Sequence, residues 1–131
     1  MRMPALLAWS WTVVILVICW LPRMYVPTHE AGPLVARWHF DKVVHAGMFT
    51  VFAYLWMRAL AGRPRPLRTV VAAGLALAVV SELGQENRYV WRDASVLDGM
   101  ADLAGVALGV VGFWAIRRGP DGEAAPPPDL A

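Results

Sequence analysis

Four long apolar stretches dominate this sequence and limit what it can fold into. They cover residues 5–21, 43–60, 67–83 and 100–116, and each is 17 or 18 residues long. An α-helix rises about 1.5 Å per residue, so these lengths are at the short end of what crosses a hydrocarbon layer of roughly 30 Å. A soluble four-helix bundle needs a polar outer face on each helix, which these stretches lack. We therefore expect an all-α integral membrane protein, a bundle of four transmembrane helices joined by short loops.

The composition favours the same class of protein. Hydrophobic residues make up 58% of the chain, charged residues 17%, and the mean hydropathy is +0.47, whereas soluble domains average about 45–50% apolar and about 25% charged residues. The chain has seven tryptophans, a residue that is enriched at bilayer interfaces. The basic residues lie beside apolar stretches, where they orient a membrane protein, so we expect no nucleic-acid partner. A single cysteine, Cys19, excludes an intrachain disulfide and a paired-cysteine metal site.

The organisation along the chain follows from these stretches. Residues 1–118 are expected to form the membrane domain, and residues 119–131, which are rich in proline, a disordered cytoplasmic tail. Residues 5–21 lack a small-residue cleavage site at their end and are expected to remain as a transmembrane helix. Residues 22–40 contain three prolines and are expected to form a mixed loop without a long helix. Asp41 would then cap the start of the second helix.

The distribution of lysine and arginine predicts the orientation. If the four stretches cross a membrane in turn, seven basic residues lie on the side of the two termini and the loop at residues 61–66, and five on the other. The seven are Arg2, Arg58, Arg63, Arg65, Arg68, Arg117 and Arg118; the five are Arg23, Arg37, Lys42, Arg88 and Arg92. Cytoplasmic loops carry an excess of basic residues, so both termini are predicted to be cytoplasmic.

One stripe of the last helix combines carboxylates with glycines. Asp98, Asp102, Gly105, Gly109 and Gly112 follow one another at spacings of four, three, four and three, which places them on one helix face. Small residues allow close approach of another helix. The stripe is therefore predicted to pack inside the monomer and to bring its carboxylates against other helices.

The predicted topology collects polar residues at the outer end of three helices. Each helix contributes two residues that share a face, and the loop before the last helix adds an arginine. These residues are Asp41 and His45, Glu82 and Gln85, Asp98 and Asp102, and Arg92. An ionisable residue in a membrane segment is costly and indicates function by default. We therefore predict an outward-facing polar pocket.

These residues resemble the motifs of the VanZ-like family, small bacterial membrane proteins named after a teicoplanin-resistance protein. The resemblance covers roughly residues 38–112. It rests on Asp41-Lys42-x-x-His45, on Glu82-x-x-Gln85, and on Arg92-x-x-Ser95-x-x-Asp98-x-x-x-Asp102-x-x-Gly105-x-x-x-Gly109. The family usually has Asn at the position of Asp102, and the Pro-Gly that often precedes its arginine is absent, since Val90 and Trp91 precede Arg92.

The resemblance implies a multi-pass protein of the bacterial cytoplasmic (inner) membrane, linked in some members to antibiotic resistance through reduced glycopeptide sensitivity. It brings no firm biochemical reaction. Expected partners are membrane lipids and a lipid-linked cell-wall precursor or glycopeptide; the oligomeric state stays open.

Several roles of the pocket remain open at this point. In a catalytic or binding site, His45, Glu82 and Asp102 are the candidates for acid–base work, and Arg92 would bind phosphate. The other candidate substrate-binding residues are Gln85, Asp41, Lys42 and Asp98. A divalent metal is a further possibility, with His45, Glu82, Asp98 and Asp102 as candidate ligands. The alternatives are a purely structural network, in which His45 pairs with Asp102 and Glu82 with Arg92, and a small transporter or proton relay.

Overall fold

The computed structural model describes residues 3–21, 34–85 and 96–118, and within the second of these segments it describes side chains from residue 42 to residue 84. This part of the chain is all-α and contains no strand. Its helices are α1 (Met3–Trp20), α2 (Leu34–Ala59), α3 (Pro66–Gln85) and α4 (Val96–Arg118). The predicted all-α, four-helix architecture is confirmed.

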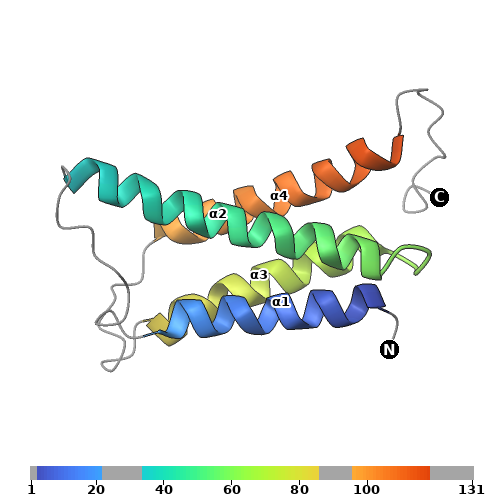
Figure 1. The fold of residues 1–131 in the computed structure, drawn as a ribbon, viewed down its shortest axis with the longest axis horizontal. Helices are drawn as coiled ribbons and strands as arrows, with labels where there is room; N and C mark the ends of the chain where they lie inside the picture. Colours follow the sequence, from blue (N-terminus) through green and yellow to red (C-terminus); the bar gives the residue numbers. More distant parts are fainter. Residues whose placement is uncertain (1–2, 22–33, 86–95, 119–131) are drawn as a thin grey trace.

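Consecutive helices run in opposite directions, so each end of the bundle collects two helix starts and two helix ends (Figure 1). The end formed by the start of α1, the turn from α2 to α3 and the end of α4 is called the basic end below. The end formed by the start of α2, the end of α3 and the start of α4 is called the polar end. The contact between α2 and α4 is the most extensive, and α2 also contacts α1 and α3. Helix α2 is therefore the central element.

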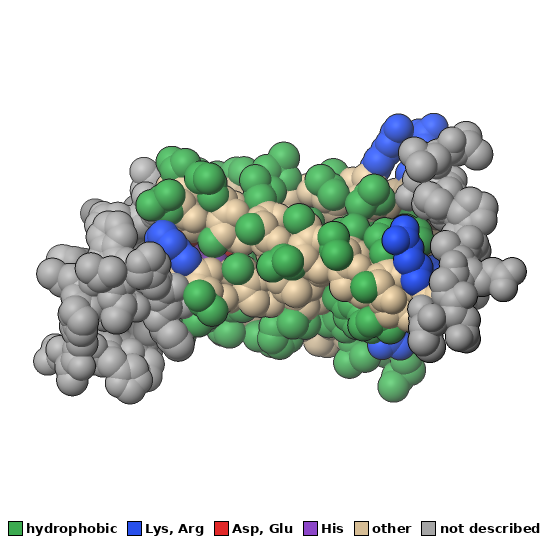
Figure 2. All heavy atoms as spheres, turned by 90° about the horizontal axis from the view of Figure 1, so that it is seen from above, with side chains coloured by type: hydrophobic (Ala, Val, Ile, Leu, Met, Phe, Trp, Pro, Cys, Tyr) green, Lys and Arg blue, Asp and Glu red, His purple; other side chains and the backbone are tan. Residues whose placement is uncertain are grey.

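Three helices are long and apolar enough to cross a membrane. They are α1, residues Pro66–Gly84 of α3, and α4, with mean hydropathies of 2.0, 1.6 and 1.7. Figure 2 shows hydrophobic side chains over the middle of the bundle and basic side chains towards both ends. Helix α2 is long enough but less apolar, because it includes Lys42, His45 and Arg58. Length and composition therefore support the prediction of membrane-crossing helices for three of the four.

Helix α2 begins earlier than predicted. It starts at Leu34 rather than at residue 43, so the predicted loop is wrong for residues 34–40. Asp41 lies inside the helix, and the prediction that it caps the start is also wrong. Residues 34–46 contain neither proline nor glycine, and Pro33 precedes them in sequence. Because this segment contains no helix breaker, the helix continues outward from the apolar residues through a more polar segment. Proline is favoured at helix starts, which agrees with a start directly after Pro33 in the sequence.

Helix α4 likewise begins at Val96 rather than at residue 100, which puts Asp98 in its first turn. Acidic residues are favoured there by the helix dipole. The predicted tail at 119–131 lies outside the described residues.

The turn between α2 and α3 is short, as predicted. The backbone N–H of Ala61 donates to Arg58 and that of Arg63 to Leu60, which closes the end of α2. Gly62 has a φ of 83°, a conformation that glycine adopts without steric cost. Pro66 then opens α3, where its missing N–H is not needed.

Two tryptophans form hydrogen bonds between α1 and α2. The indole N–H of Trp11 donates to the backbone oxygen of Met48 at 2.9 Å, and that of Trp56 donates to Oγ1 of Thr12 at 3.1 Å. Trp9 packs edge-on against Trp56, with 5.0 Å between ring centroids. The sequence suggested that tryptophans mostly anchor the bilayer interface; these two also join helices.

Candidate functional site

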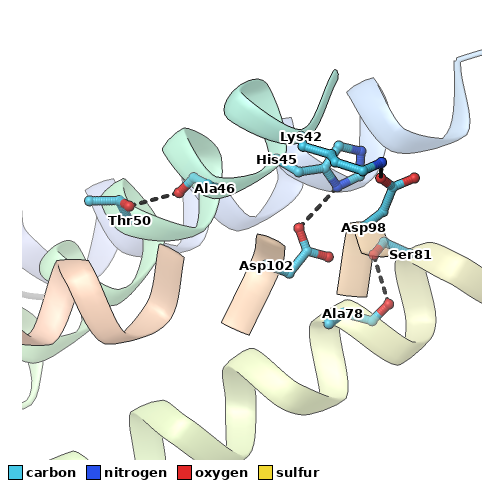
Figure 3. A network of polar contacts seen from close by, with 8 residues as sticks. All are labelled: Lys42, His45, Ala46, Thr50, Ala78, Ser81, Asp98 and Asp102. Atoms are coloured by element: carbon cyan, nitrogen blue, oxygen red, sulfur yellow. Dashed lines mark hydrogen bonds and ion pairs between the residues drawn. The ribbon is translucent and has the colours of Figure 1, made fainter. Parts of the chain in front are cut away.

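Two polar pairs connect α2 with α4 near the polar end (Figure 3). Nζ of Lys42 lies 3.0 Å from Oδ1 of Asp98, and Nδ1 of His45 lies 2.9 Å from Oδ1 of Asp102. The basic member of each pair comes from α2 and the carboxylate from α4. These four residues form what we call the paired site.

Helix geometry explains why both pairs form together. Lys42 and His45 are three residues apart, and Asp98 and Asp102 are four apart, so each couple lies on one helix face, about one turn apart. Helices α2 and α4 run in the same direction, from the polar end to the basic end. Lys42 therefore pairs with Asp98 and His45 with Asp102, in the order in which these residues follow one another along the two helices.

Burial increases from the first pair to the second. The side chains of Lys42 and Asp98 are 25% and 9% exposed, whereas those of His45 and Asp102 are 3% and 0% exposed. The paired site thus runs from a partly exposed ion pair to an enclosed imidazole and carboxylate. A polar ligand approaching the polar end would meet Lys42 and Asp98 before it reached His45.

Two glycines of α4 allow the close approach that these contacts need. A Cβ at Gly105 would meet the backbone oxygen of Ala46 and would lie 2.9 Å from Cβ of Phe49. A Cβ at Gly109 would meet the backbone oxygen of Thr50. The predicted packing role is confirmed for these two positions. It is wrong for Gly112, where a Cβ would meet nothing within 4 Å.

Helix α3 closes the other side of Asp98 and Asp102. Ser81 is fully buried, and its hydroxyl donates to the backbone oxygen of Ala78 at 2.8 Å. Figure 3 shows Ser81 across Asp98 and Asp102 from Lys42 and His45. Ser81 was not among the site residues predicted from the sequence, although a hydroxyl beside Glu82 in an apolar helix was a signal that could have identified it.

The structure describes only some of the remaining predicted residues. Glu82 is half-buried near the end of α3, at the same end of the bundle as the paired site. The side chains of Asp41 and Gln85, and the whole of Arg92, lie outside the described residues. The structure therefore brings together four of the predicted residues: Lys42, His45, Asp98 and Asp102.

The predicted metal ligands do not gather into a metal site in the described segments. Among the residues described there, no three His, Cys, Asp or Glu side chains are grouped so that they could hold an ion. The reason is visible in the pairs, since Asp98 faces an ammonium group and Asp102 faces an imidazole. The chemistry that this arrangement offers is hydrogen bonding, charge pairing and proton exchange at His45.

No protein-family model matches the sequence, and no curated protein and no solved structure matches it. The class of the protein therefore rests on its own features. It is an all-α bundle with three helices long and apolar enough to cross a membrane, and it has a polar paired site between its two most closely packed helices.

Proposed function

We propose that this chain is a VanZ-like protein of the bacterial cytoplasmic membrane, and that its paired site binds the polar part of a lipid-linked envelope precursor. In this proposal the polar end faces outward and both termini are cytoplasmic. Any effect on glycopeptide sensitivity would follow from binding or processing of that precursor.

The observation that carries the proposal is the enclosed contact between His45 and Asp102, directly below the partly exposed Lys42 and Asp98. Ionisable groups are costly inside a membrane protein, so two adjacent pairs at one end of the bundle favour a ligand site. Lys42 offers N–H donors and Asp98 offers acceptor oxygens to a polar ligand. Asp102 orients the His45 ring, as carboxylates do for imidazoles that exchange protons.

The same contacts support α2 as a fourth membrane-crossing helix. The charged and polar groups that lower its hydropathy near the polar end, Lys42 and His45, point to α4 and pair with carboxylates there. Between Lys42 and the end of α2, the next Asp, Glu, Lys or Arg residue is Arg58, which lies in the last turn at the basic end. A helix enclosed by three neighbours needs less apolar surface than one that faces lipid all round.

A second function is favoured by one specific observation. The contact between His45 and Asp102 lies beside the close approach of Gly105 to Ala46, where a hydrogen bond between helices would also lock the bundle. In this alternative the protein is a non-enzymatic module that acts on partners, and the paired site only stabilises α2 against α4.

An exchange of charges separates the two functions. The double variant Lys42→Asp/Asp98→Lys keeps an ion pair between the helices but moves the ammonium group to α4. The full chain is placed in lipid nanodiscs, and binding of a purified polyprenyl-diphosphate-linked cell-wall precursor is measured beside thermal unfolding. Arg68→Gln, at the basic end, is the matched charge control.

Ligand binding predicts that Lys42→Gln and the double variant both weaken precursor binding at least about tenfold, which corresponds to about 1.4 kcal/mol. The double variant should recover the thermal stability that Lys42→Gln loses. If the wild-type chain binds no precursor, or if the double variant recovers binding together with stability, the ligand-binding function is wrong and the structural one is favoured.

A further inference from the structure

A pocket lies at the basic end of the bundle, opposite the paired site. Its volume is about 430 Å³, and it opens between the last turns of α2 and α4, beside the first turn of α1. The residues of α2, of the turn after it and of α4 that line the pocket are Tyr54, Arg58, Ala61, Phe113, Ile116 and Arg117. It shares no residue with the paired site.

The pocket exists because α2 and α4 separate towards this end. Gly109 still touches the backbone of α2, whereas a Cβ at Gly112, one turn further, would meet nothing within 4 Å. Figure 1 shows the two helices diverging in the same direction. Beyond that point Tyr54 and Phe113 occupy the space between them, with 6.4 Å between ring centroids. These two aromatic rings line the pocket.

The guanidinium group of one arginine lies over each of these rings. Cζ of Arg58 lies 5.9 Å from the centroid of Tyr54, and Cζ of Arg117 lies 5.4 Å from that of Phe113. Stacking on a ring engages the face of a guanidinium and leaves the N–H donors at its edge for an acceptor. No carboxylate in the described parts of the chain forms an ion pair with either arginine.

The surroundings of the pocket are positively charged. The basic end also carries four further arginines, which are Arg63, Arg65, Arg68 and Arg118. The acidic side chains that the structure describes, Glu82, Asp98 and Asp102, all belong to the polar end. The arginines would therefore attract an anion to the pocket, and none of the carboxylates that the structure describes lies at this end to repel it.

We infer that Arg58 and Arg117 bind the phosphate of an anionic phospholipid at the basic end. Two planar guanidinium groups from neighbouring helices suit the oxygens of a phosphodiester, which they bind bidentately. Phe113 and Ile116 give the acyl chains an apolar wall next to the headgroup, and basic pockets between membrane helices suit such lipids. The inference needs only the membrane class of the protein and holds for either orientation.

The test measures lipid binding to the full chain by native mass spectrometry. Wild-type protein is released from nanodiscs of phosphatidylcholine that contain a graded fraction of phosphatidylglycerol, and the dissociation constant of each lipid is obtained. Arg58→Gln and Arg117→Gln remove the two proposed ligands. Arg118→Gln removes the same charge from the neighbouring residue, which does not line the pocket.

The wild-type chain should retain phosphatidylglycerol in preference to phosphatidylcholine. Arg58→Gln and Arg117→Gln should each weaken phosphatidylglycerol binding by about five- to tenfold, and Arg118→Gln by less than about twofold. Both pocket arginines are exposed, so the variants should keep the thermal stability of wild type in pure phosphatidylcholine. Because they lie on different helices, either variant tests the site if the other misfolds.

Three results would overturn the inference. One is equal retention of the two lipids by the wild type. Another is a loss in Arg118→Gln as large as that in Arg117→Gln, which would indicate a general effect of surface charge. The third is displacement of phosphatidylglycerol by excess inorganic phosphate, which would indicate a site for a free anion.

Discussion

His45 on α2 and Asp102 on α4 meet at 2.9 Å between Nδ1 and Oδ1, and both side chains are almost completely enclosed by the bundle. The contact lies one helix turn from Gly105, where α4 touches the backbone of α2. Polar bonding and close backbone packing thus occur at the same level. Each depends on the other, because the short side chains of aspartate and histidine meet only when the helices are close.

Substitutions at Asp102 should separate hydrogen bonding from charge. Asp102→Ala leaves the enclosed His45 without this acceptor, and we expect it to lower the free energy of unfolding by about 1–3 kcal/mol. Asp102→Asn keeps an acceptor oxygen of the same shape and should cost less than half as much. Unfolding in mixed detergent micelles measures both. Equal losses in the two variants would show that the negative charge, rather than the hydrogen bond, stabilises the contact.

The glycines of α4 should differ in their tolerance of alanine. A Cβ at Gly105 or Gly109 would meet backbone oxygens of α2, which cannot move without shifting the helix. Gly105→Ala and Gly109→Ala should each reduce stability by about 1–3 kcal/mol.

Gly112→Ala is the matched control for these two variants. Its Cβ meets nothing within 4 Å, and alanine is the better helix former by up to about 1 kcal/mol. Gly112→Ala should therefore be neutral or stabilising in the same unfolding experiment. A destabilised Gly112→Ala together with a tolerated Gly105→Ala would contradict the packing of α2 against α4 described above.

The apolar stretches made the four helices predictable, but the starts of α2 and α4 were not. A hydropathy pattern ends where the apolar residues end, whereas a helix continues until something breaks it. Residues 34–42 contain no breaker, so α2 extends through a polar segment. The same reasoning applies to Val96 and Asp98, which precede the apolar part of α4.

Part of the site could also be predicted from spacing. The i,i+4 relation of Asp98 to Asp102 and the glycines after them indicated one face of one helix, and the contact of His45 with Asp102 was among the pairings expected for a structural network. The pair of Lys42 with Asp98 was not predicted, since Lys42 was assigned to ligand binding alone. Spacing within one helix does not determine how a second helix is rotated against it, and this rotation selects the partners.

The tryptophans between α1 and α2 should contribute unequally. Trp11→Phe and Trp56→Phe keep an aromatic ring but remove an indole N–H that donates to the other helix. Each should lower the free energy of unfolding by about 0.5–1.5 kcal/mol. Trp9→Phe is the control, because the Trp9 side chain is 52% exposed and makes an edge contact only. A loss in Trp9→Phe as large as the others would attribute the effect to ring size.

The orientation of the bundle can be tested with single cysteines in a Cys19→Ala background. Val96, at the polar end, is 84% exposed, and Arg63, in the turn at the basic end, is also exposed. The excess of basic residues at the basic end favours its retention in the cytoplasm. In intact bacterial cells, a membrane-impermeant maleimide should therefore label Val96→Cys, and it should label Arg63→Cys only after the membrane is opened. The reverse pattern would place the paired site on the cytoplasmic side and would exclude its proposed access to an outward-facing precursor. The lipid site at Arg58 and Arg117 would then bind lipid of the outer leaflet and would not be excluded.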